Sequence, residues 1–114
     1  MLRTIVATLL WLPLIAAAQP WPAKPVRMIV SYPAGGGADT MARLISPKLS
    51  EALGQPVVVE NRGGASGTIA GDLVARASPD GYTLMLDAAN HSVNPSLLAT
   101  IPYDTAKAFA PVTL

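Results

Sequence analysis

Apolar residues fall along this chain in short continuous runs that alternate with longer segments of helical spacing. The runs at 26–32, 56–60 and 83–86 are rich in valine, leucine and methionine, as is typical of buried strands. Over 39–53 and 67–77, apolar residues recur at three- and four-residue steps, which predicts two amphipathic helices. This order of strand, helix, strand, helix, strand predicts right-handed crossovers and a parallel sheet covered on both faces. The expected fold class is therefore α/β.

The pattern is interrupted once and becomes less regular after the third strand. Pro47 falls in the middle of the first helix, where proline removes a hydrogen bond, so we expect a kink or a break around 45–46. Residues 87–95 are expected to form a loop, followed by a short helix over 96–99. Residues 111–114 have the pattern of the start of a fourth strand.

The first 18 residues have the pattern of an export signal. Arg3 precedes a nearly continuous apolar stretch over 5–18, and the alanines at 16–18 provide the small residues that signal peptidase needs. With about fourteen residues and an internal proline, the stretch is shorter than the roughly 20 residues that span a bilayer. We therefore expect cleavage near Ala18, a periplasmic location for residues 19–114, and no stable membrane insertion after cleavage.

Composition and charge exclude several classes of function. The chain has no cysteine, which excludes disulfides, thiolate metal sites and a cysteine nucleophile. It has a single histidine, His91, and scattered acidic residues, so we expect no metal site and no cofactor. Arg3 belongs to the signal, and the other seven of the eight basic residues balance seven acidic residues. Because there is no basic cluster, we expect no nucleic-acid partner.

Two glycine-rich segments stand where a predicted strand gives way to a predicted helix, one at 32–40 and one at 61–68. Glycine lets the main chain approach a ligand closely, and the following helix points free N–H groups and its positive end at the turn. Because such turns bind anions, we predict a pocket for a carboxylate or phosphate group. Its candidate ligand-binding residues are Tyr32, Ala34, Gly35, Gly36, Gly37, Ala38 and Asp39 in the first segment and Gly64, Ala65, Ser66, Gly67 and Thr68 in the second.

Each glycine segment also has a simpler interpretation. Neither has the spacing of a P-loop or of G-x-G-x-x-G, and tight-turn chemistry alone would explain the glycines. Asp39 stands at the start of the first helix and is expected to cap its free N–H groups. Beside an anion site its carboxylate would repel the ligand, unless it points away or binds an amino group. Ser66 lacks the second glycine of G-x-S-x-G, because Thr68 stands there. A secreted hydrolase that uses Ser66 with His91 is nevertheless the rival hypothesis from another class.

Six short motifs follow one another in order over 21–114. They are Trp-Pro-x-Lys-Pro-Val-Arg, Tyr-Pro-x-Gly-Gly, Leu-Gly-Gln-Pro-Val-Val-Val-Glu-Asn-Arg at 53–62, Gly-Gly-Ala-Ser-Gly-Thr-Ile-Ala-Gly at 63–71, Pro-Asp-Gly-Tyr-Thr-Leu at 79–84 and Asn-Pro-Ser-Leu at 94–97. In this order they resemble the periplasmic substrate-binding proteins of tripartite tricarboxylate transporters, often called the Bug family. Pro47 departs from the family pattern, which has a helix-favouring residue there.

The resemblance implies a two-domain α/β clamp, a Venus flytrap, that captures a small carboxylate and delivers it to a membrane permease. In that family, two strand-turn-helix loops hold one ligand carboxylate through backbone amides and ordered water, and the two glycine segments match those loops. The end of the third strand, Asp87-Ala88-Ala89-Asn90, would also face the cleft. Family members are much longer than residues 19–114, so we expect these residues to form an incomplete first lobe.

Three functional hypotheses therefore follow from the sequence. The leading one is a receptor for a small carboxylate, without catalytic residues, which works with the permease of a tripartite tricarboxylate transporter. The second is the hydrolase fragment, and the third is a truncated piece with no activity of its own. The sequence specifies neither the carboxylate nor the permease.

Overall fold

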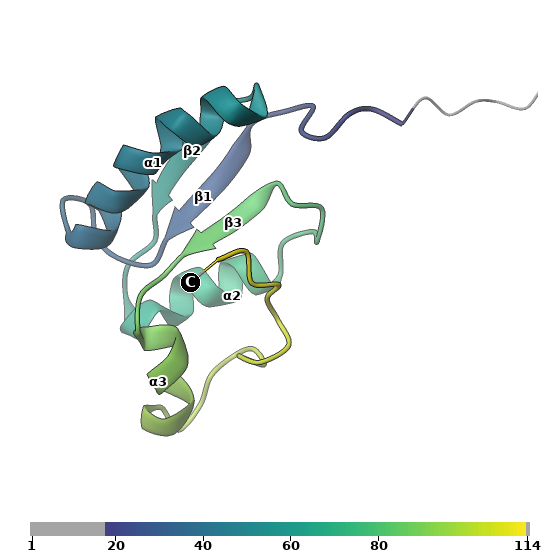
Figure 1. Cartoon of the computed structure of the whole chain (residues 1–114). Coiled ribbons are helices and arrows are strands. Elements are labelled where there is room, and N and C mark those ends of the chain that lie inside the picture. The colour runs from purple at the N-terminus through teal and green to yellow at the C-terminus, as the bar shows by residue number, and fades with distance from the viewer. Residues whose placement is uncertain (1–17, 114) are drawn as a thin grey trace, which may run out of the picture.

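The computed structural model describes residues 18–113, in which strands and helices alternate along the chain (Figure 1). The predicted signal segment lies outside these residues, apart from Ala18. The predicted order of strand, helix, strand, helix, strand is confirmed, and with it the α/β class. In chain order the elements are β1 (Val26–Val30), α1 (Gly37–Leu53), β2 (Val57–Asn61), the short 3-10 helix η2 (Ala65–Gly67), α2 (Thr68–Ala75), β3 (Thr83–Leu86) and α3 (Asn90–Leu97).

β1 is the middle strand of a parallel sheet with the order β2-β1-β3. Val26 pairs with Val57 of β2, and Arg27 pairs with Thr83 of β3. With neighbours on both edges and helices on both faces, β1 is the most deeply buried strand, and its residues Val26, Ile29 and Val30 are fully enclosed. Burial on both faces explains why the apolar residues of β1 form a continuous run rather than alternating with polar ones.

The helices α1 and α2 cover opposite faces of the sheet (Figure 1). α1 packs on β1 and β2, and α2 packs on β3 and β1. On the α1 side, Ala42 is fully buried in a core cluster that includes Met28 and Val57. Because side chains alternate along a strand, Ile29 points to the opposite face. One central strand therefore supplies the apolar core of both layers.

α1 runs without interruption from Gly37 to Leu53 with Pro47 inside it, so the predicted break in the first helix does not occur. Pro47 lies on the exposed side of the helix, where water can solvate the carbonyl group that proline leaves unbonded. The end of the helix is also tied to the sheet: the Ser50 hydroxyl donates to the Ser46 carbonyl (2.7 Å) and accepts from the Val57 N–H (2.8 Å). These tertiary contacts outweigh the local cost of the proline.

Two further predictions for the segment after β3 are wrong. Residues 90–97 form α3, whereas the sequence predicted a loop to 95 and a helix over 96–99. Pro95 and a polar composition hid this helix, whose contacts are made with η2 rather than with the sheet. Residues 111–113 are not in a strand, and they line the cavity beside β3.

The outer edge of β3 borders a cavity with a volume of about 1330 Å³ and a mostly apolar lining. Side chains of α1, residues of β3 and the segment after 105 surround it. None of the helices within residues 18–113 has the length and hydropathy needed to cross a bilayer.

The segment after α3 is held against α2 by Tyr103, whose ring lies directly over Gly71. A methyl group at Gly71 would overlap the Tyr103 hydroxyl and ring. We therefore expect Gly71→Ala to lower the free energy of unfolding by about 1–3 kcal/mol through overpacking. Urea titration followed by circular dichroism would measure this loss. Gly37→Ala is the matched control, because a Cβ there meets open space, and an equal loss in both variants would contradict the assigned packing.

Candidate functional site

The carboxyl ends of the three parallel strands meet at one edge of the sheet, where the strand arrows in Figure 1 point. The first glycine turn follows β1, the second follows β2, and residues 87–89 follow β3. A Cβ at Gly63 would lie 3.1 Å from the Pro33 nitrogen, and the Asn61 side-chain amide donates to the Tyr32 carbonyl (3.1 Å). The structure thus brings together the two segments that the sequence predicted as one site.

The first turn leads directly into the 17-residue helix α1. Gly35 has a φ of 85°, a conformation that favours glycine, and Gly36 is the N-cap. No acceptor among the described residues takes the N–H groups of Gly37 and Ala38, the first two residues of the helix. These N–H groups and the positive end of the helix dipole can therefore bind an anion without a formal positive charge.

Asp39 holds the first turn in shape from within the protein. Its carboxylate is only 4% exposed and accepts hydrogen bonds from the Gly35 N–H (2.9 Å), the Arg43 Nε (3.0 Å) and the Asn61 amide (3.0 Å). The prediction that Asp39 caps α1 is wrong, because its carboxylate bonds the residue before the N-cap and no side chain caps the helix at Gly36. The donors from Arg43, Gly35 and Asn61 lower the pKa of Asp39 from 3.8 to about 2.

Sequence reasoning missed two members of this network, Arg43 and Asn61. Arg43 stands four residues after Asp39, the helical spacing for an ion pair, and this signal was available in the sequence. Asn61 comes from the end of β2, and only the parallel pairing of β2 with β1 brings its amide to both Tyr32 and Asp39. No spacing along the chain could have predicted that contact.

The second turn has an unusual backbone. Four successive residues have positive φ: Gly64 (118°), Ala65 (47°), Ser66 (53°) and Gly67 (85°). For the two residues that carry a Cβ, this conformation costs on the order of 1–3 kcal/mol each. Such strain persists only where surrounding contacts impose it, and it is concentrated at functional sites. Thr68, the first residue of α2, donates its hydroxyl to the Ala65 carbonyl (2.8 Å).

Two amides from α3 hold the strained turn. The Ser66 carbonyl accepts hydrogen bonds from Asn94 Nδ2 (2.8 Å) and from Asn90 Nδ2 (3.3 Å). Asn94 is 5% exposed, so this contact is shielded from water. Asn90 was among the ligand-binding residues predicted from the sequence, and its side-chain amide contacts the second glycine turn. Asn94 was missed, because a loop was expected where α3 lies.

The residues that follow β3 form the third segment at this edge of the sheet. Asp87 Oδ1 accepts from the Ser31 hydroxyl (2.5 Å) and from the Ala88 N–H (2.9 Å). Ala88 itself is exposed. Burial, followed by the negative charge of Asp87, raises the pKa values of the Tyr32 and Tyr103 phenols. All three strand ends therefore contribute to the same edge, as expected for ligand sites in open α/β sheets.

The geometry gives the hydrolase hypothesis no support. The His91 ring packs edge-on against Phe109, with ring centroids 5.1 Å apart. Within residues 18–113, no hydrogen bond joins His91 to Ser66, whose carbonyl rather than hydroxyl is engaged. The same residues contain no group of three or more histidine, aspartate or glutamate side chains able to hold a metal ion.

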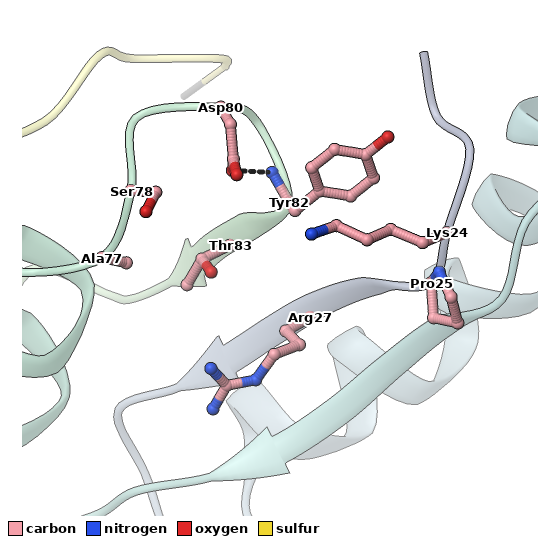
Figure 2. Close-up of a pocket in the computed structure, with 8 residues that line it drawn as sticks. All are labelled: Lys24, Pro25, Arg27, Ala77, Ser78, Asp80, Tyr82 and Thr83. Carbon is pink, nitrogen blue, oxygen red and sulfur yellow. Dashed lines mark hydrogen bonds between the residues drawn. The ribbon is translucent and has the colours of Figure 1, made fainter. Parts of the chain in front are cut away.

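A smaller cavity of about 390 Å³ lies at the opposite end of the sheet, where β1 and β3 begin (Figure 2). The Lys24 ammonium is 4.6 Å from the centroid of the Tyr82 ring, a cation–π contact. Arg27 pairs with Glu60 through two hydrogen bonds of 2.7 and 2.9 Å. The two cations that line this cavity, Lys24 and Arg27, thus have partners within the chain. The glycine turns lie at the other end of the strands.

Comparison with known proteins places these features in a family. Residues 41–114 match the tripartite tricarboxylate transporter family receptor. The chain is 50% identical over 99 residues to a UPF0065 protein of Bordetella bronchiseptica, a match that covers 85% of this chain and 29% of that protein.

Among solved structures, the chain resembles the periplasmic binding protein BugD, with a TM-score of 0.77 and 44% identity over 81% of this chain and 31% of BugD. It also resembles MatC of Rhodopseudomonas palustris with bound malate, with a TM-score of 0.74 and 40% identity over 81% of this chain and 32% of MatC. The chain therefore spans less than a third of the length of these relatives.

The Asn94 contact leads to a stability prediction. Asn94→Ala removes the buried donor to the Ser66 carbonyl, so we expect the free energy of unfolding to fall by about 1–3 kcal/mol. Asn90→Ala should cost less, because its hydrogen bond is longer and exposed. Urea denaturation of the two variants compares them directly. Equal losses would mean that Asn94 does not hold the turn.

The pKa of Asp39 leads to a prediction about acid stability. Because the folded state holds this pKa at about 2, below the ordinary 3.8, the unfolded state takes up the proton first as pH falls. The contribution of Asp39 to the free energy of unfolding is therefore complete above pH 3.8 and is lost as pH falls towards about 2. We expect the urea midpoint of the wild type to decline over this window more steeply than that of Asp39→Asn. The exposed Glu51→Gln variant is the control, and its curve should parallel the wild type.

Proposed function

We propose that this chain, which belongs to the tripartite tricarboxylate transporter receptor family, provides the carboxylate-binding turns of a periplasmic solute receptor. The family is one of receptors rather than of enzymes. The observation that carries the proposal is the pair of N–H groups at Gly37 and Ala38, which have no acceptor among the described residues and follow β1 at the end of the sheet where the second glycine turn follows β2. A carboxylate there would be bound by backbone donors and a helix dipole.

The ligand class follows from the chemistry of the turns and from a relative. Helix N-termini recognise the charge and shape of an anion, and MatC, whose structure resembles this chain, holds malate. We therefore infer that the ligand is a small carboxylate with one carboxyl group held between the two turns. The remainder of such a ligand would contact parts of a longer protein, since relatives are more than three times as long as the matched segment.

The proposal extends to location and partner. Residues 1–18 would direct export and be removed near Ala18, so that residues 19–114 act in the periplasm as part of a first lobe. The ligand would be passed to the membrane permease of a tripartite tricarboxylate transporter. Expression of the chain with its own leader, followed by mass spectrometry of the periplasmic product, would test the cleavage position.

Gly37→Pro tests the role of the backbone donors. Proline at the first helical position fits the fold, because it is favoured there and the preceding Gly36 is already extended (φ −80°, ψ 176°). The variant should therefore fold normally but lack one N–H group facing the ligand. Losing a hydrogen bond to a charged group costs roughly 1.5–3 kcal/mol, so we expect carboxylate affinity to fall about tenfold or more.

Gly37→Ala is the matched variant, because it adds a Cβ but keeps the N–H group. Isothermal titration of both variants and the wild type with malate, succinate, citrate, glutamate and nicotinate measures the affinities. The ratio between the proline and alanine variants isolates the contribution of the N–H group. Equal affinities in a well-folded pair would refute anion binding by the first turn, and no binding of any carboxylate by the wild type would refute the proposed function of the chain.

A further inference from the structure

Asp87 lies between the two glycine turns. It follows β3 directly, and its Oδ1 atom accepts from the hydroxyl of Ser31, the residue just before the first turn. On its other side is the second turn, where a Cβ at Gly67 would lie 3.6 Å from the same oxygen. Asp87 is partly exposed, and its contacts with Ser31 and beside Gly67 place its carboxylate next to both turns.

This carboxylate has no cationic partner within residues 18–113, where no lysine, arginine or histidine pairs with it. The two arginines nearest the turns are engaged elsewhere, Arg43 with Asp39 and Arg62 with Glu60. Both hydrogen bonds to Asp87 end on Oδ1, which leaves Oδ2 without a donor from the described residues. Its charge also contributes, after burial, to the raised pKa values of the Tyr32 and Tyr103 phenols.

An unpaired carboxylate in a site for carboxylates affects which ligands can bind. A ligand that brings only negative charge is repelled, whereas one that also brings a positive group gains an ion pair. In an α-amino acid, the ammonium and carboxyl groups share one carbon atom. A ligand whose carboxyl group is held between the turns would therefore carry its ammonium group close to Asp87.

We propose that Asp87 is a specificity-determining residue, which selects an amino carboxylate over a dicarboxylate without an amino group. The inference rests on the proposed function, because it concerns the same site between the two turns. It assigns to Asp87 the contact with an amino group that the sequence had suggested for Asp39. Asp39 is closed off by Arg43, Asn61 and the Gly35 N–H, whereas Asp87 retains an oxygen without a partner.

Three ligands on one carbon skeleton test the selection. Aspartate carries an ammonium group where malate carries a hydroxyl group and succinate a hydrogen atom. Titration of the purified wild type should give an affinity for aspartate about tenfold or more above that for succinate, with malate well below aspartate. Malate binding as tightly as aspartate would overturn the inference, and this comparison needs no variant to fold.

Asp87→Asn removes the charge and keeps an oxygen that can accept from Ser31 and Ala88. We expect the preference for aspartate over succinate to fall to about twofold or less in this variant. Glu51→Gln, which removes an exposed charge on α1, should keep the wild-type preference. An unchanged preference in Asp87→Asn, or an equal gain in affinity for both ligands, would overturn the role of Asp87 while leaving the proposed function intact. Binding of none of the three ligands by the wild type would instead refute the proposed function.

Discussion

The two parallel ladders that join β1 to β2 and to β3 are the constraint on which the rest of the structure depends. They align three carboxyl ends at one edge, and from there each connection departs with its own turn. The contacts of Asn61 with Tyr32 and of Asp87 with Ser31 exist only because of this register. A slip of one residue would turn these side chains to the other face of the sheet and dismantle the site.

The two glycine turns differ in backbone conformation and in the contacts that hold them. The first is regular, because its N–H groups are the ordinary free donors of a long helix and a buried carboxylate fixes its shape. The second is strained through Ala65 and Ser66 and depends on amides from α3. The first turn is therefore held by Asp39 of α1 and Asn61 of β2, whereas the second is held by α3, which follows β3 in the chain.

The sequence was informative where local rules decide the structure. Apolar runs predicted β1, β2 and β3, helical spacing predicted α1 and α2, and the glycines located both turns. It failed where distant contacts decide. Proline is unfavourable inside a helix, but α1 continues through Pro47, and Ser50 bonds the end of the helix to β2. α3 has a polar composition and contains Pro95, yet Asn94 makes it part of the site through a single buried hydrogen bond. The roles of Asn61 and Asp87 depend on strand register, which no motif encodes.

The distribution of charge bears on how the proposed site could bind an anion although two aspartates lie beside it. Asp39 is neutralised by Arg43 and by two further donors, and its depressed pKa reflects that balance. The helix dipole of α1 then acts on the ligand rather than on Asp39, because the carboxylate bonds Gly35 and leaves the N–H groups of Gly37 and Ala38 open. Asp87 accepts hydrogen bonds from Ser31 and Ala88 but has no cationic partner among the described residues. The proposed site would therefore combine a neutral surface of backbone donors with one negative charge, and under our proposal a ligand that carries both signs of charge would fit that combination better than a purely anionic one.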